Sequence, residues 1–172
     1  ANWKMFGSVK LVNSLNNVIS YSKKNKQKAK IVYCPPYTLL KSFIDKTKNS
    51  NIEIGAQDCH INPDYGPHTG AISSKMIKDL GAKFVIIGHS ETREENDNKK
   101  INLKIKSALN KKLKVIFCIG EKLIDKKKNK TKFVLKKQLL EGLKNLNKLN
   151  KVIIAYEPVS YTHLRAHETT PH

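Results

Sequence analysis

Three side chains of different chemistry stand at or near the ends of apolar segments in this sequence. Glu157 ends the run 152–156, His89 follows the run 84–87 after one glycine, and Lys4 lies close to the first residue. A carboxylate at the end of a buried strand can act as a general base whose pKa is set by an apolar pocket, and a histidine there suits acid or electrophilic work. A lysine directed into the same site is costly unless it meets an anion. Together they supply one base, one electrophile and one cation.

Each of these residues also has a purely structural interpretation when taken alone. Lys4 could belong to a frayed terminus, His89 could be hydrogen-bonded inside the core, and Glu157 could be a surface or helix-capping carboxylate. The prediction of catalysis therefore rests on the combination rather than on any single residue.

Three further residues could support this group. Asn2 and Lys4 are two positions apart, so on a strand their side chains point to the same side. Glu91, two residues after His89, could pair with Lys4 or cap the next segment. We interpret Cys118 as mainly structural, because a cysteine in an apolar run is more often a core residue than a nucleophile.

Five short apolar runs must position these residues, and helical patterns separate them. The runs are mostly continuous rather than alternating, which is typical of parallel strands covered by helices; they occupy 31–34, 52–56, 84–87, 115–119 and 152–155. Apolar stripes at helical spacing lie between them, at 11–19, 76–80, 101–109 and 135–146, with Gly81 as a helix stop. This alternation predicts an α/β fold with a parallel sheet.

Two parallel-sheet architectures remain open from the spacing. The runs begin about 30 residues apart, as in successive βαβ units, and eight such units would give the ~240 residues of a (β/α)8 barrel. A doubly wound open sheet is the alternative, but it favours a glycine-rich turn after its first strand. No Gly-x-Gly-x-x-Gly occurs in the sequence.

The net charge of +19 raises the question of a nucleic-acid partner. Only two of the 33 basic residues are arginines, Arg93 and Arg165. Base recognition and phosphate binding rely strongly on arginine, and the lysines here are spread over predicted helix faces. We therefore expect a solvated lysine surface and no nucleic-acid partner, with a nucleic-acid-binding protein kept as an alternative.

The cysteines and the lengths of the apolar runs indicate where in the cell the protein works. Cys34, Cys59 and Cys118 show no Cys-x-x-Cys spacing, which favours reduced thiols and a cytoplasmic location. No apolar run approaches the roughly 20 residues of a membrane helix, so we expect no membrane partner.

Taken in order, the local motifs resemble one family, triosephosphate isomerase. The resemblance runs from residue 1 to 159 and rests on Asn-Trp-Lys-Met at 2–5, Gly-Ala-Gln at 55–57, His-Thr-Gly at 68–70, Gly-His-Ser-Glu at 88–91, Cys-Ile-Gly-Glu at 118–121 and Ala-Tyr-Glu-Pro-Val at 155–159. It implies a (β/α)8 barrel, incomplete here, from the end of the first strand through the sixth. A different phosphate-binding α/β barrel without isomerase activity is the other alternative.

The resemblance implies a glycolytic isomerase that interconverts dihydroxyacetone phosphate and glyceraldehyde 3-phosphate through an enediolate. Glu157 would carry the proton between the two carbons, and a neutral His89 would polarise the carbonyl, as is established for this family. Lys4 would supply positive charge, Asn2 would bind substrate and fix Lys4, and Glu91 would support them. No cofactor and no metal are implied.

The family also implies a homodimer of the intact parent. The segment 58–72 matches the loop through which two subunits interlock, with Thr69 near the partner's active site. Long loops without regular structure are usually functional.

The composition changes at Ser160. Residues 160–172 contain no lysine and three of the six histidines, and they depart from the family's lid sequence. We interpret 1–159 as a partial barrel domain and 160–172 as a non-native-looking tail. His163 and His167, beside Glu168, could bind a metal on a helix, but no third ligand is evident. We expect this chain to be nearly inactive and to expose open sheet edges.

Overall fold

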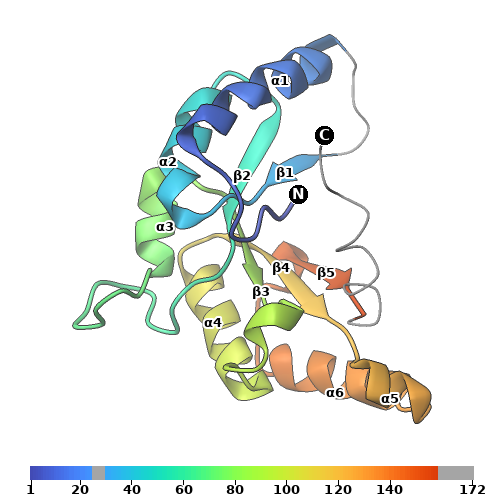
Figure 1. The fold of residues 1–172 in the computed structure, drawn as a ribbon. Coiled ribbons are helices and arrows are strands. Elements are labelled where there is room, and N and C mark those ends of the chain that lie inside the picture. Colours follow the sequence, from blue (N-terminus) through green and yellow to red (C-terminus); the bar gives the residue numbers. More distant parts are fainter. Residues whose placement is uncertain (25–29, 159–172) are drawn as a thin grey trace.

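A curved, five-stranded parallel sheet forms the centre of the molecule (Figure 1). The computed structural model describes residues 1–24 and 30–158 of the 172. The strands follow one another in chain order, as β1 (Ile31–Tyr33), β2 (Ile52–Ala56), β3 (Phe84–Ile87), β4 (Lys114–Ile119) and β5 (Val152–Tyr156). All five predicted runs are confirmed as strands, and their ends shift by no more than one residue.

The first residues add the end of one more strand beside β1. Asn2 forms a parallel bridge with Cys34, the Trp3 amide donates to the Cys34 carbonyl at 3.0 Å, and the Cys34 amide donates to the Ala1 carbonyl at 2.8 Å. The strand that ends at Asn2 therefore precedes β1, and the order from it to β5 follows the chain without any reversal. A doubly wound sheet reverses its order at a switch point, whereas a barrel does not. The incomplete (β/α)8 barrel is confirmed.

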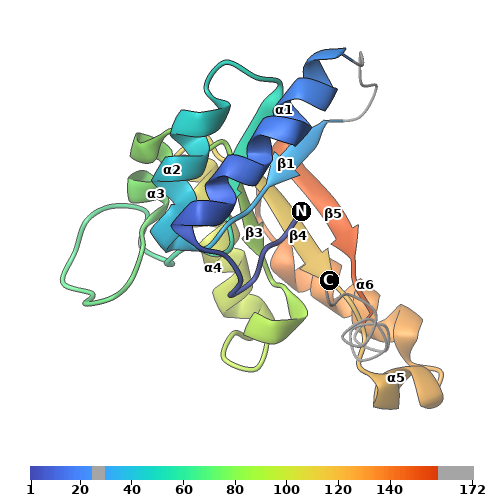
Figure 2. The ribbon, with the colours of Figure 1, turned by 45° about the horizontal axis from the view of Figure 1, so that its top comes forward.

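Helices connect the strands and pack along one side of the sheet (Figures 1 and 2). They are α1 (Leu15–Lys24), α2 (Tyr37–Thr47), α3 (Ser74–Leu80), α4 (Asn98–Asn110), α5 (Leu123–Lys127) and α6 (Thr131–Gly142), with short 3-10 turns η1 (Val9–Ser14), η2 (Ser90–Thr92) and η3 (Leu149–Lys151). Gly81 ends α3 with a φ of 106°, as predicted. The stripe predicted at 135–146 is too long, because α6 already ends at Gly142.

The main core lies between the sheet and these helices. Phe43, Ile77, Ile105 and Phe117 are among its fully buried side chains. No apolar stripe was predicted for α2, although Leu39, Leu40 and Phe43 are part of its buried face. None of the helices within the described residues is long and apolar enough to cross a membrane.

The opposite, concave side of the sheet carries a small cluster. Cys34, Ile86 and Cys118 are buried there, and Ala155 packs against them. At the far edge β5 is much more open: Ile153 is 50% exposed and Ile154 is 44% exposed. Within the part of the chain that is described, β5 pairs with β4 alone. The expected open edge is therefore present at β5.

Candidate functional site

The carboxyl-terminal ends of the strands gather the residues singled out from the sequence. His89 follows β3 through Gly88, Glu157 directly follows β5, and Lys4 comes two residues after the bridge at Asn2. Because all of these strands are parallel, their carboxyl ends lie at one edge of the sheet. Glu157, His89 and Lys4 thus lie at one edge of the sheet.

Glu157 and His89 are in direct contact at this edge. The Nε2 atom of His89 lies 3.1 Å from Oε2 of Glu157, with His89 buried and Glu157 about two-fifths exposed. The Glu157 amide donates to the carbonyl of Ile119 at 2.8 Å. Gly120 lets the backbone of Glu157 lie close to the end of β4, since a Cβ built on Gly120 would lie 2.1 Å from the Glu157 carbonyl oxygen. The end of β4 therefore fixes the backbone of the candidate base.

The turn after β3 sets the protonation pattern of His89. Its Nδ1 accepts a hydrogen bond from the backbone N–H of Glu91 at 3.3 Å, at the start of η2. An imidazole nitrogen that accepts a backbone N–H carries no proton, so the hydrogen-bond network assigns the proton of the neutral ring to Nε2. Nε2 is the ring nitrogen that lies next to Glu157, 3.1 Å from its Oε2.

Lys4 is held by backbone contacts in an uncommon conformation. Its φ is 51°, in the left-handed region that non-glycine residues rarely occupy. The Lys4 amide donates to Oδ1 of Asn2 at 3.0 Å, and its carbonyl accepts from Nε2 of Gln57 at 2.8 Å. Its Nζ lies 2.8 Å from Oε1 of Glu91. This pair is well exposed, so it orients the lysine more than it stabilises the fold.

Gln57 was not among the predicted site residues. Its side-chain amide donates to Lys4 and also to the carbonyl of Cys34 at 2.9 Å, joining the end of β2 to the first strand. The available signal was its place at the end of Gly-Ala-Gln, where a polar residue closes a buried strand.

The electrostatics of Glu157 differ from the sequence-based interpretation. We expected an apolar pocket to set its pKa, but its polar neighbours do so. The hydrogen bond from His89 lowers the pKa of Glu157, partial burial opposes that change, and the charges of His89 and Lys4 lower it further. The carboxylate form is thereby favoured, as a general base requires.

Cys118 lies beneath this pair and acts as a packing residue, in line with its structural interpretation. Burial, and then the negative charge of Glu157, raise the pKa of the Cys118 thiol to about 12. The thiol stays protonated at neutral pH and can donate toward Glu157, whose pKa it helps to lower. It is unsuited to act as a nucleophile.

Arg93 is a second residue that the sequence analysis did not place in the site. Its Nη2 donates to the carbonyl of Cys118 at 2.9 Å, and its Nη1 donates to Oδ1 of Asn98 at 2.9 Å. Burial lowers its pKa. Gly88, with a φ of 77°, leaves room for it, since a Cβ there would lie 3.2 Å from Nη2. Arg93 thus ties the turn that carries His89 to β4.

Thr69 lies apart from this group. It is exposed on the long segment between β2 and α3, which projects from the body of the molecule beside α3 and α4 (Figure 1). Asp58, at the base of this loop, pairs with Nζ of Lys104 in α4. The projecting tip is available for contact with another subunit.

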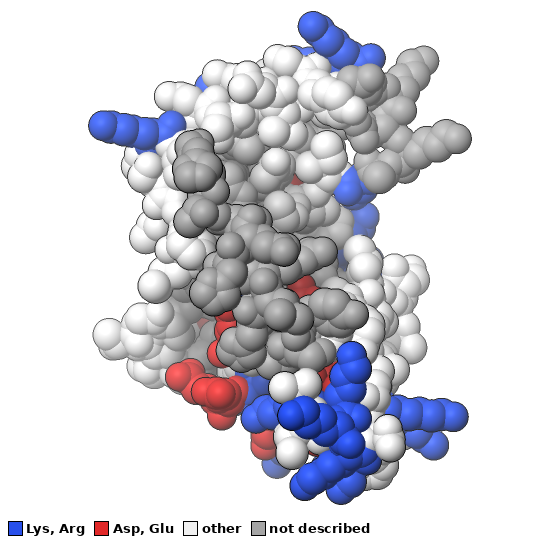
Figure 3. Space-filling model, turned by 45° about the vertical axis from the view of Figure 1, so that its right-hand side comes forward, with Lys and Arg blue, Asp and Glu red and all other residues white. Residues whose placement is uncertain are grey.

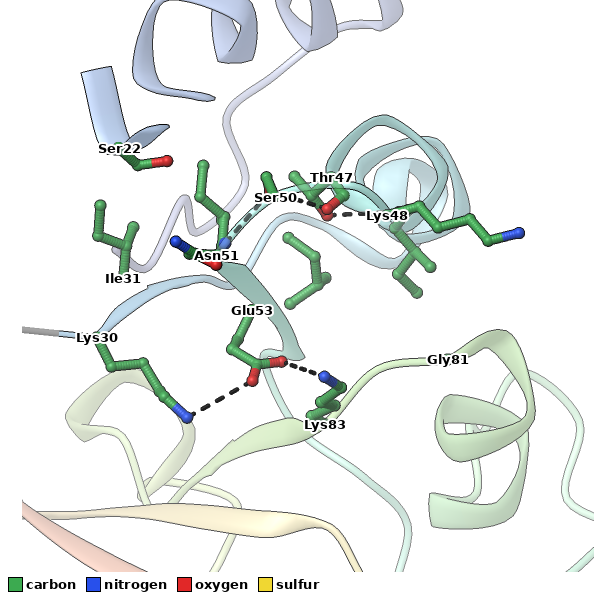
Figure 4. A pocket seen from close by; sticks show the side chains of 13 residues that line it. Ser22, Lys30, Ile31, Thr47, Lys48, Ser50, Asn51, Glu53, Gly81 and Lys83 are labelled. Atoms are coloured by element: carbon green, nitrogen blue, oxygen red, sulfur yellow. Dashed lines mark hydrogen bonds and ion pairs between the residues drawn. The ribbon is translucent and has the colours of Figure 1, made fainter. Parts of the chain in front are cut away.

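A separate cavity lies away from this group (Figure 4). It has a volume of about 670 Å³ and is lined by the starts of β1 and β2, at the opposite end of the sheet from His89. Glu53 lies between Lys30 and Lys83 there, at 3.5 and 2.9 Å. None of the predicted site residues lines it. Within residues 1–24 and 30–158, no group of three or more His, Cys, Asp or Glu could hold a metal ion.

Comparison with known proteins assigns the family. The family model described as triosephosphate isomerase matches residues 1–161. The chain belongs to the triosephosphate isomerase family. The triosephosphate isomerase of Dictyoglomus thermophilum is 43% identical over 163 residues, and that of Wolbachia pipientis is 40% identical over 163 residues. Both alignments cover 92% of this chain.

A solved structure of this family shares the fold. The crystal structure of triosephosphate isomerase from Bartonella henselae superposes with a TM-score of 0.85 at 36% identity, covering 96% of this chain and 70% of that one. The chain spans 65% of the Dictyoglomus protein and 62% of the Wolbachia protein. The predicted tail, with His163, His167 and Glu168, lies outside the described residues, and the boundary at 159 stays a prediction.

Proposed function

We propose that residues 1–158 carry the proton-transfer group of a triosephosphate isomerase. The intact parent would interconvert dihydroxyacetone phosphate and glyceraldehyde 3-phosphate in glycolysis and gluconeogenesis. The observation that carries this proposal is the contact of 3.1 Å between Nε2 of His89 and Oε2 of Glu157, at the same sheet edge as Lys4. Family membership favours this function over the other two hypotheses, a different phosphate-binding barrel and a nucleic-acid-binding protein.

The proposed reaction moves one proton between adjacent carbons. The Glu157 carboxylate takes a proton from the carbon next to the substrate carbonyl, and the electron pair of that C–H bond passes to the carbonyl oxygen. The Nε2–H of His89 and the charge of Lys4 stabilise the resulting enediolate. His89 moves the proton of the adjacent hydroxyl to the former carbonyl oxygen, which leaves a new carbonyl on the first carbon, and Glu157 returns its proton to the former carbonyl carbon. One carbon is oxidised and the other reduced within the same molecule, so no cofactor is needed.

The supporting residues have distinct proposed roles. Asn2 and Gln57 hold the backbone of Lys4, and Asn2 also contributes to substrate binding. Glu91 orients Lys4 through its carboxylate and His89 through its backbone N–H. Loss of any of these contacts would misplace a charge relative to the developing enediolate.

We also propose a homodimeric, cytoplasmic parent. The loop 58–72, which is exposed at 64–70 and carries Thr69, would reach a second subunit. Cys34, Cys59 and Cys118 are all buried free thiols, which suits a reducing compartment.

Activity should be tested in a chimera that restores a full-length barrel. Residues 1–158 replace the matching segment of the Dictyoglomus thermophilum relative, which supplies its own residues before and after that segment, and isomerisation of glyceraldehyde 3-phosphate is followed in a coupled assay. We expect turnover in the chimera and little in the chain alone. Replacing Glu157 by Gln should lower kcat by roughly 10²- to 10⁴-fold, the usual contribution of a general base.

The matched control replaces Glu95, an exposed carboxylate outside this group, by Gln and should leave kcat unchanged. Circular dichroism establishes that each variant is folded. A folded chimera without isomerisation, or one that tolerates Glu157→Gln, contradicts the proposal. Turnover in the chain alone close to that of the chimera contradicts the expected inactivity.

A further inference from the structure

Helix α6 presents apolar side chains on two opposite sides. Leu135 and Leu139 pack against the main core. Phe133 and Leu140 lie seven residues apart, hence on one side of the helix, and are 67% and 64% exposed. At 100° per residue their side is turned roughly 150° from that of Leu135. Among residues 1–24 and 30–158, Phe133 and Leu140 do not belong to the core, so their exposure calls for another explanation.

Lysines surround this stripe. The stretch 122–137 contains eight lysines and a single acidic residue, Asp125, giving a net charge of +7. All eight are exposed: Lys122, Lys126, Lys127, Lys128, Lys130, Lys132, Lys136 and Lys137. Figure 3 shows blue side chains crowded at the lower end of the molecule, where Figure 1 places α5 and α6.

Helix α5 extends the same combination. Leu123 and Ile124 are 50% and 53% exposed beside Lys126–Lys128, and α5 packs against α6. We call these eight lysines together with Leu123, Ile124, Phe133 and Leu140 the α5–α6 face. Its exposed apolar groups lie among cations, the arrangement found where helices rest on anionic membrane surfaces.

We propose that the α5–α6 face docks on an anionic lipid surface. Four exposed apolar side chains would enter the boundary between headgroups and acyl chains, while the lysines contact lipid phosphates and carboxylates. The sequence-based expectation of no membrane partner rested on the lack of a spanning segment, and surface docking needs none. This inference is independent of the proposed isomerase function.

Other occupants fit the face less well. A second copy would bring two stretches of +7 together, and like charges repel. A nucleic acid would be expected to meet arginines and several stacking aromatics, whereas this stretch contains no arginine and one aromatic residue, Phe133. An anionic bilayer accommodates both the lysines and the aliphatic side chains.

The test is flotation of the whole chain with lipid vesicles, which separates bound protein from aggregates that sink. One vesicle set contains phosphatidylcholine alone, and the other contains phosphatidylcholine and phosphatidylserine in equal amounts. We expect binding to the phosphatidylserine vesicles alone, weakening as salt is raised. Each lysine near such a surface contributes roughly fivefold to binding.

Two variants and a control separate the contributions. Lys132, Lys136 and Lys137 replaced together by Gln should weaken binding on the order of 100-fold. Phe133 and Leu140 replaced by Gln should weaken it by about tenfold or more, through lost apolar insertion. The control replaces Lys10, Lys23 and Lys24 by Gln; these exposed lysines belong to η1 and α1, and Figure 1 shows α1 far from α5 and α6. This control variant loses the same number of positive charges, and its affinity for the vesicles should stay within about twofold of that of the unmutated chain.

Several results overturn the proposal. If the chain does not float with the phosphatidylserine vesicles, the proposal is wrong. If replacing Lys10, Lys23 and Lys24 weakens binding as much as replacing Lys132, Lys136 and Lys137, binding depends on net charge and not on the α5–α6 face. If the chain binds single-stranded RNA more tightly than phosphatidylserine vesicles, and the Phe133 and Leu140 changes do not weaken RNA binding, the face binds nucleic acid instead. Concentration-dependent dimers that disappear in the Phe133 and Leu140 variant assign it to a second copy.

Discussion

At the residue scale, the pKa of Glu157 is the most direct test of the site. The ordinary value is 4.5, and the hydrogen bond from His89 lowers it, with Lys4 contributing less. A lowered pKa in the folded state means that this interaction stabilises the fold fully above pH 4.5. Its stabilisation is lost as the pH falls through the lowered value. The carboxylate is about two-fifths exposed, so the effect on stability is small.

We therefore predict the order of three pKa values for Glu157, measured by NMR titration of its carboxyl carbon. The parent chain should titrate below 4.5. Lys4→Met should raise the value slightly, and His89→Leu should raise it more, because the hydrogen bond outweighs the more distant charge. A Lys4 effect larger than the His89 effect would show that the 3.1 Å contact is not the dominant one.

At the element scale, the strands and their order followed from the sequence more readily than the connections did. Continuous apolar runs such as 84–87 can be buried strands or short buried helix segments. The spacing of about 30 residues between the starts of successive runs favours strands, because it matches the βαβ unit. No apolar stripe was predicted for α2, although Leu39, Leu40 and Phe43 recur at helical spacing directly after Pro35 and Pro36. The roles of Gln57 and Arg93 depend on carbonyls contributed by residues far along the chain, which no local pattern reveals.

A partly buried ion pair joins the long loop to α4, a contact that the sequence did not predict. Nζ of Lys104 in α4 contacts Oδ2 of Asp58, and the two side chains are 9% and 28% exposed. Asp58→Asn should lower the free energy of unfolding by about 3 kcal/mol, because it leaves an unpaired buried ammonium. Lys104→Met should cost only about 1 kcal/mol, since Asp58 can still be hydrated. Urea unfolding measures both.

The double variant Asp58→Asn with Lys104→Met decides how this pair acts. It should be close in stability to Lys104→Met alone, because no unpaired charge remains buried. If the costs of the two single changes simply add, the pair contributes no coupling, and the anchoring of the long loop to α4 must come from its backbone contacts.

At the scale of the whole molecule, the open side of the sheet decides how the chain behaves in solution. A barrel is stable against edge pairing because every strand has two neighbours. Here β5 has one neighbour within the described residues, and Ile153 and Ile154 expose apolar surface on both faces of that strand. The net charge of +19 opposes association, but salt screens that repulsion while the apolar edge persists.

We predict that the chain self-associates through β5 at physiological salt, as measured by sedimentation velocity over a range of protein concentrations. Ile153→Lys places a charge on the edge strand and should shift the distribution toward monomer. Leu103→Lys adds the same charge on α4, at a side chain that is 39% exposed, and should leave association unchanged. Equal effects of the two changes would point to net charge instead. If the unmutated chain stays monomeric and unfolds cooperatively, β5 is protected from pairing. The incomplete barrel would then be stable without further strands.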